Sequence, residues 1–100
     1  MKTVVAVVRT TSLENVIGAL EKIGVKGVTI SEVRGLGSEV SLGSPYTIHK
    51  RIEIIVPDAA ADMIANVIAE QAHTGLPGDG LIAVNPTEYL VRIRSKEKLQ

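Results

Sequence analysis

A glycine-rich segment, residues 74–80, is the strongest candidate in this chain for a ligand-binding element. It reads Thr-Gly-Leu-Pro-Gly-Asp-Gly. Three glycines in seven residues can expose several backbone N–H groups together, and such concave arrangements bind anions because the N–H dipoles point at the ligand. The same composition is also typical of a tight turn from a helix to a strand. Glycine content alone favours the turn.

Two arginines would supply positive charge to such a site. Arg92 and Arg94 alternate with Val91, Ile93 and Ser95, so on a strand both guanidinium groups lie on one face. Paired arginines facing a glycine turn suit the geometry of a phosphate. The alternative is an exposed edge strand that charge protects from pairing with other chains.

Polar and glycine positions in two further segments are compatible with a ligand. Gly35-Leu36-Gly37 follows an expected strand, where glycines either let a ligand approach the backbone or begin a loop. Thr29 and Glu53 are polar positions within otherwise apolar segments. Either side chain would satisfy an adenine edge or face solvent.

Catalytic and metal-binding motifs are weak. The chain has no cysteine and two histidines, His49 and His73, without the spacing of metal ligands. No nucleophile elbow accompanies them. Each histidine is expected to be solvated or to cap a helix. A metal site made of His49, Glu39 and Asp79 stays open, but nothing argues for it.

Hydrophobic patterning predicts the elements that must position these residues. Two amphipathic helices are expected. The first spans residues 13–23, with Ser12 as its N-cap and Gly24 as its stop. The second is capped by Asp58 and buries one apolar stripe. That stripe comprises Ala60, Met63, Ile64, Val67 and Ile68. Strands are expected at residues 2–9, 27–34, 51–56, 81–84 and 89–94, with a long loop between residues 34 and 50.

This order of elements is the split βαβ pattern, so we expect an α+β, ferredoxin-like βαββαβ sandwich with a short C-terminal strand. Two helices cover one face of such a sheet. The first strand is nonetheless apolar at consecutive positions, Val4 to Val8, which predicts a strand covered on both faces. A second copy of the chain must then supply the cover, which predicts a homo-oligomer.

Composition limits the possible partners. The 100 residues carry 11 basic and 11 acidic side chains, for a formal net charge of zero, and two aromatic residues, Tyr46 and Tyr89. A neutral chain with few aromatic faces is not expected to bind nucleic acid. No apolar stretch approaches the roughly 20 residues of a membrane span. We therefore expect one cytoplasmic domain, residues 1–100, without direct membrane insertion.

Five segments together resemble the PII family of nitrogen-regulatory signal-transduction proteins. They are Val25-Lys26-Gly27-Val28-Thr29-Ile30, Glu32-Val33-Arg34-Gly35-Leu36-Gly37, Ile52-Glu53-Ile54-Ile55-Val56-Pro57-Asp58, the glycine-rich segment 74–80, and Val91-Arg92-Ile93-Arg94. They occur in the family's order over nearly the whole chain. Each is a modest signal alone, whereas their order and spacing together are specific.

The resemblance implies a non-catalytic homotrimer that binds adenine nucleotide (ADP, AMP or ATP) in clefts between subunits. Such a protein regulates a target, such as a membrane transporter or a metabolic enzyme, through a T-loop, here about residues 37–50. Residues matching the family's adenine and ribose side are Val7, Thr29, Gly35, Leu36, Gly37 and Ile55. Those matching its phosphate side are Thr74, Gly78, Asp79, Gly80, Arg92 and Arg94. Ser38 joins the nucleotide-binding set, and Tyr46 is a possible modification site.

Departures from the family pattern bear on the ligand. Leu81 stands where the family has a phosphate-binding Lys, Ser38-Glu39 where it has Arg-Gln, and His49 where it has another Lys. The T-loop is also shorter. Missing cations favour AMP or ADP over Mg-ATP and weigh against the family's magnesium and 2-oxoglutarate sites. The function implied is regulation in nitrogen or carbon metabolism. The alternatives are an interaction trimer that has lost nucleotide binding, and a metal-binding or enzymatic trimer.

Overall fold

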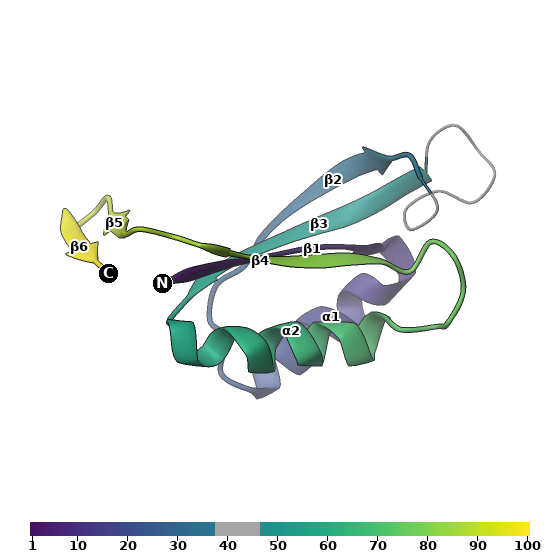
Figure 1. Cartoon of the computed structure of the whole chain (residues 1–100), viewed down its shortest axis with the longest axis horizontal. Coiled ribbons are helices and arrows are strands. Elements are labelled where there is room, and N and C mark those ends of the chain that lie inside the picture. Colours follow the sequence, from purple (N-terminus) through teal and green to yellow (C-terminus); the bar gives the residue numbers. More distant parts are fainter. Residues whose placement is uncertain (38–46) are drawn as a thin grey trace.

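The computed structural model describes residues 1–37 and 47–100. A four-stranded antiparallel sheet in the order β2-β3-β1-β4 carries both helices on one face (Figure 1). The elements are β1 (Lys2–Arg9), a 3-10 turn (Thr10–Ser12), α1 (Leu13–Lys22), β2 (Thr29–Gly35), β3 (Thr47–Val56), α2 (Asp58–Ala72), β4 (Gly80–Pro86), β5 (Leu90–Arg92) and β6 (Glu97–Leu99). The expected α+β, ferredoxin-like arrangement is confirmed.

The core lies between the helices and the two central strands. Alternate residues of β1 and β3 point into it, as the two-residue period of a strand requires. The buried apolar side chains are Val4, Ala6, Val8, Val16, Leu20, Ile52, Ile54, Val56, Ala61, Ile64, Ile68 and Ala72.

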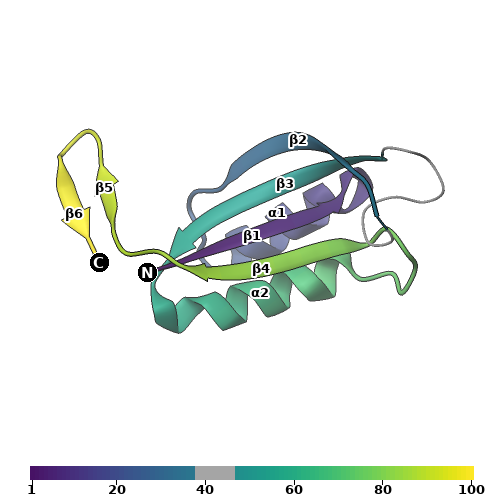
Figure 2. The same ribbon diagram turned by 45° about the horizontal axis from the view of Figure 1, so that its top comes forward.

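Both helices of residues 1–37 and 47–100 lie on the same face, so neither covers the opposite face of the sheet (Figure 2). In β1, only alternate residues are fully buried, and Val5 and Val7 are half-buried on the open face. Ile55 and Leu81, which alternation places on the same face, are 42% and 50% exposed. Within one chain, the expectation that β1 is covered on both faces is therefore not met, and an apolar sheet face of this kind calls for a partner.

Of the two expected N-caps, Ser12 stands at the N-cap position of α1 and Asp58 does not cap α2, whereas the C-terminal stop of α1 is confirmed. Ser12 belongs to the 3-10 turn and its side chain makes no capping bond. Asp58 is the first residue of α2, and its carboxylate lies 2.9 Å from the N-terminal amino group. The hydrogen bond from that amino group lowers the pKa of Asp58. Gly24 has φ 92°, and the bonds from Gly24 N to Glu21 O and from Val25 N to Leu20 O close α1 as a Schellman motif.

The buried stripe of α2 is displaced from the expected one. Ala61, Ile64, Ile68 and Ala72 are buried, whereas Met63 is half exposed. Ala60 and Val67 pack only at the edge of the core. Two small alanines, Ala61 and Ala72, are therefore buried in the core where Met63 was expected.

Strands β3 and β4 are longer than predicted. β3 begins at Thr47 instead of residue 51, and its first residue pairs with Gly35 of β2. β4 runs to Pro86, which pairs with Lys2 at the end of this edge strand. Proline is tolerated there because an edge residue need not donate to a neighbour. Three of the first four residues of β3 are polar, Thr47, His49 and Lys50, which is why hydrophobic patterning does not reveal where the strand starts.

The expected single C-terminal strand is instead a hairpin, β5–β6, that projects from the body beyond the N-terminal end of β1 (Figures 1 and 2). Arg92 pairs with Glu97 across it, at 3.5 Å. Arg94 lies in the turn rather than in a strand. The prediction that Arg92 and Arg94 share one strand face is therefore wrong.

Gly80 and Gly18 form a matched pair of positions for testing where the backbone leaves room for a side chain. Gly80 has φ 109°, and a Cβ there would lie 1.8 Å from the carbonyl oxygen of Val7, whereas a Cβ at Gly18 meets nothing within 4 Å. Gly80→Ala should destabilise the fold by about 1–3 kcal/mol. Gly18→Ala, inside α1, should stabilise it by about 0.5–1 kcal/mol. Urea unfolding at one fixed chain concentration measures both, and an unchanged midpoint for Gly80→Ala would contradict this close approach.

Candidate functional site

The glycine-rich loop, residues 74–80, connects α2 to β4. Its central turn, Leu76-Pro77-Gly78-Asp79, has proline second and a glycine with φ 94° third, the signature of a type II turn. Gly75 and Gly80 also have positive φ values, 85° and 109°. The backbone alone therefore accounts for all three glycines.

The Asp79 carboxylate fills the anion-binding concavity of this loop. It accepts hydrogen bonds from the N–H groups of Thr74 (2.8 Å) and Gly75 (2.9 Å), and from the Thr74 hydroxyl. Arg9 Nε donates a further bond at 3.2 Å. The N–H groups of Thr74 and Gly75 are therefore not exposed to a ligand, because the loop supplies its own anion, and this favours the alternative of a tight turn. The bonds from Thr74, foremost, hold the pKa of Asp79 well below its ordinary range.

Two side chains at the end of the sheet hold the loop by its carbonyl groups. Arg9 Nη2 donates to Pro77 O at 2.7 Å, and the Nε2 atom of His49 lies 3.0 Å from Gly78 O. His49 is 2% exposed, so the expectation of a solvated or capping histidine is wrong for it. Sequence reasoning also missed Arg9. One signal was present, a charged residue ending an otherwise apolar strand.

The metal-site alternative gains no support. His49 faces a carbonyl oxygen, and Asp79 is occupied by its own loop. Glu39 lies outside the described residues. Within residues 1–37 and 47–100, no group of three His, Asp or Glu side chains is placed to hold a metal.

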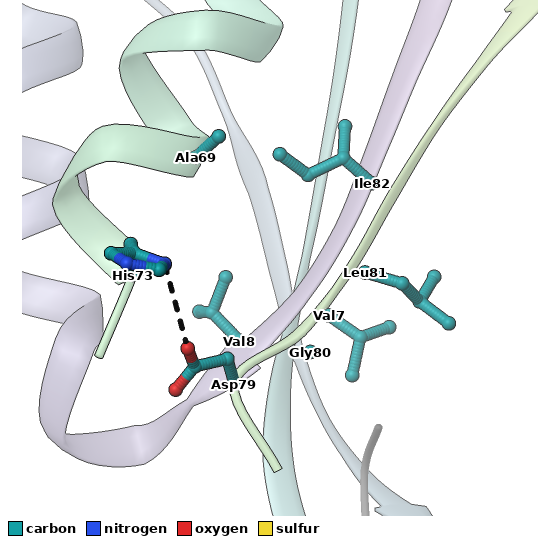
Figure 3. Close-up of a pocket in the computed structure, with 9 residues that line it drawn as sticks. Val7, Val8, Ala69, His73, Asp79, Gly80, Leu81 and Ile82 are labelled. Carbon is teal, nitrogen blue, oxygen red and sulfur yellow. Dashed lines mark ion pairs between the residues drawn. The ribbon is translucent and has the colours of Figure 1, made fainter. Parts of the chain in front are cut away.

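A small cavity of about 230 Å³ opens beside the loop, between α2 and the first residues of β4 (Figure 3). Three expected site residues line it: Val7, Asp79 and Gly80. Figure 3 shows His73 and Asp79 pointing toward one another, with Nδ1 4.0 Å from Oδ2. Small-molecule sites usually begin at about 300 Å³, so this cavity suits only part of a nucleotide.

Leu81 also lies at the wall of this cavity. Its side chain points away from α2 in Figure 3 and is half exposed. β2 ends at Gly35, which pairs with Thr47 at the start of β3. Leu36 and Gly37 follow the strand, and Leu36 is largely exposed. Ser38 and Tyr46 lie outside the described residues.

A second group of expected residues lies elsewhere. Ile55 and Arg92, together with Gly27, line a cavity of about 450 Å³. Thr29 begins β2 and pairs with Glu53 of β3. This cavity also takes in the end of β3 and the start of α2.

The two groups occupy opposite ends of the sheet. Thr29 and Gly35 are six residues apart along β2, which is about 20 Å in a strand. The glycine-rich loop precedes β4 and the arginine hairpin follows it, and both figures place them at opposite ends (Figures 1 and 2). The expectation of arginines facing the glycine turn is therefore not met within one chain.

The Asp79 anchor predicts a pH dependence. Its pKa falls below the ordinary value of 3.8, so its charge stabilises the folded chain above about pH 4, and this contribution is lost as the pH falls further. Asp79→Asn should therefore melt at a lower temperature than the parent at pH 7, with the difference narrowing toward pH 3. Asp62→Asn, which removes an exposed carboxylate on α2, is the control. A difference that stays constant from pH 7 to pH 3 would refute the anchor.

Comparison with known proteins places these features in a family. The sequence model of the nitrogen regulatory protein P-II family matches residues 1–97. The P-II protein of Microchaete diplosiphon is 42% identical over 107 aligned positions, covering 98% of this chain and 96% of that protein. P-II protein 2 of Methanothermobacter thermautotrophicus is 39% identical, covering 97% and 92%.

A solved structure agrees. The crystal structure of Arabidopsis thaliana PII bound to citrate superposes with a TM-score of 0.85 at 36% identity, covering 97% of this chain and 83% of that one. None of the helices in residues 1–37 and 47–100 has the length and apolarity needed to cross a bilayer. P-II proteins are typically trimeric, non-catalytic signal transducers that bind adenine nucleotides and regulate target proteins. This chain belongs to the P-II family of nitrogen regulatory proteins.

Proposed function

We propose that this P-II chain is a cytoplasmic homotrimer that binds AMP or ADP in preference to Mg-ATP, in clefts between neighbouring chains. It then regulates a transporter or enzyme of nitrogen or carbon metabolism through its T-loop, about residues 37–50. The observation that carries the proposal is the separation of the site residues into two groups at opposite ends of the sheet.

A ring of three chains would bring the two groups together. Each chain would offer its glycine-rich loop to one neighbour and its Thr29, Ile55 and Arg92 group to the other. Such head-to-tail contacts close into a ring with equivalent sites. The open apolar face of the sheet, with Val5 and Val7, gives the chains a surface to bury.

Charge at the loop supports a ligand with few phosphates. Arg9 is paired with Asp79, and the neighbouring Leu81 is apolar. The N–H groups of Thr74 and Gly75 already bind Asp79. A triphosphate would therefore meet less positive charge than it requires, whereas AMP or ADP carries less negative charge and requires less.

The same facts favour a second candidate, an interaction trimer that has lost nucleotide binding. Calorimetric titration with AMP, ADP and Mg-ATP, with and without 2-oxoglutarate, separates the two. Binding with AMP or ADP preferred supports the first candidate. No heat with any nucleotide supports the second, and tight Mg-ATP binding strengthened by 2-oxoglutarate contradicts the selectivity proposed here.

Removing the arginine half of the site should abolish binding without disturbing assembly. The double variant Arg92→Ala with Arg94→Ala should lose ADP affinity at least tenfold and stay trimeric by light scattering, because charge-assisted bonds to phosphate are lost. Lys22→Ala, at the exposed end of α1, is the control for lost charge. Unchanged ADP affinity in the double variant would refute the assignment.

Mixed trimers test whether two chains build each site. Leu81→Glu places a negative charge at the glycine side, so this variant alone should not bind ADP. Co-refolded with the double arginine variant, it should regain binding, with at most one intact site in each mixed trimer. A mixture without any binding would show that both halves act within one chain.

Restoring a cation at the glycine side should alter selectivity. Leu81→Lys should strengthen Mg-ATP binding by roughly ten- to a hundredfold, the equivalent of one charged hydrogen bond. AMP affinity should change little. Leu81→Met controls for side-chain length, and equal gains for AMP and Mg-ATP would contradict the role given to Leu81.

A further inference from the structure

His49 is a fully buried polar side chain on the face of the sheet that the helices leave open. The core-facing residues of β3 are Ile52, Ile54 and Val56, so strand alternation places His49 on the other face. It is nonetheless 2% exposed. The glycine-rich loop lies against it at this end of the sheet, with Gly78 O 3.0 Å from Nε2.

The imidazole ring lies between two carbonyl groups from different segments. Nε2 faces Gly78 O, and Nδ1 lies 3.5 Å from Thr47 O, at the first residue of β3. Because a carbonyl oxygen only accepts, Nε2 carries a hydrogen and donates it to Gly78. Gly78 is itself buried, so water cannot readily replace this donor.

The first residues of β3, before His49, pair with a neighbouring strand on one side only. The pairing of β1 with β3 ends at Arg9 and His49, whereas the pairing of β2 with β3 continues to Gly35 and Thr47. Thr47 and Ile48 therefore belong to a two-stranded ribbon that extends past the rest of the sheet. Two-stranded ribbons are marginally stable alone, so a contact at their base has a large influence on them.

We propose that His49 is a positioning residue that couples the glycine-rich loop to the start of β3. A ligand that displaces the loop then displaces Thr47 to His49 as well, and through the Val33–His49 and Gly35–Thr47 pairs it reaches β2. The identity of that ligand rests on the proposed function, whereas the coupling itself is a property of the ligand-free protein. Arg9 holds the same loop but connects it to β1.

The ligand-free test loosens the loop and observes the strand. Thr74→Val removes the hydroxyl bond to Asp79 and the bond that the hydroxyl accepts from Leu76 N–H, and it leaves His49 and Arg9 unchanged. Backbone amide hydrogen exchange should then accelerate several-fold both in the loop, at Thr74, Gly75 and Gly78, and in residues 47–49. In a His49→Leu background, which lacks the donor, the acceleration should be confined to the loop.

Conservative replacement separates coupling from general stability. His49→Gln carries an amide donor of comparable reach, so Thr74→Val in this background should again accelerate exchange both in the loop and in residues 47–49. If His49 had a purely structural role, the exchange rates would instead follow the melting temperature of each variant. If His49→Leu does not fold, His49→Asn, which is too short to span to Gly78, takes its place. Two outcomes would overturn the proposal. One is that Thr74→Val leaves exchange at residues 47–49 unchanged in the parent, and the other is that it accelerates this exchange equally in His49→Leu.

A ligand arm uses ADP as the probe. In the parent, ADP should shift the amide resonances of residues 47–49. In His49→Leu these shifts should vanish while calorimetry still detects ADP, weakened less than tenfold. Unchanged shifts in His49→Leu would refute the coupling. Absence of ADP binding to the parent would refute the proposed function, and the exchange experiment would still decide the role of His49.

Discussion

The candidate site depends on one carboxylate. Asp79 gathers the first residues of the glycine-rich loop around itself and ties them to Arg9 at the end of β1. Without that anion, two adjacent backbone N–H groups and the Nε–H of Arg9 would lose their acceptor. Glycines make the turn sterically possible, but Asp79 selects one conformation from the many that three glycines allow.

The conformation of the loop also determines where the first residues of β4 lie. Gly80 passes so close to Val7 that no side chain fits between them, and Leu81 then begins the edge strand beside the cavity. The last residue of the loop is therefore also part of the sheet, as the first residue of β4. The length of β4 sets the distance from the glycine-rich loop to Arg92. Side-chain rotation within one chain is too small a movement to bring the two together.

Much of the fold follows from local patterns that a single sequence displays. The apolar run of β1, the helical spacing before Gly24 and the order of elements are all visible because each depends on neighbouring residues. The start of β3 was hidden because His49 and Lys50 are polar, and Met63 was placed in the core because hydrophobicity alone does not fix the rotation of a helix. The burial of His49 depends on a loop 29 residues away, and Arg94 left its expected strand because a turn intervenes before β6. The burial of His49 is a long-range fact that propensity does not contain, whereas the turn that takes in Arg94 is local, between Arg92 and Glu97.

The hairpin that projects beyond the N-terminal end of β1 has a thermodynamic consequence. In the proposed ring, a chain that separates from its neighbours keeps no complete site, so ligand occupancy and assembly are linked equilibria. Ligand binding would draw free chains into rings, and dilution would release ligand even at constant ligand concentration. The apparent affinity of this protein would therefore depend on how much of the chain is present, which makes abundance itself an input to the signal.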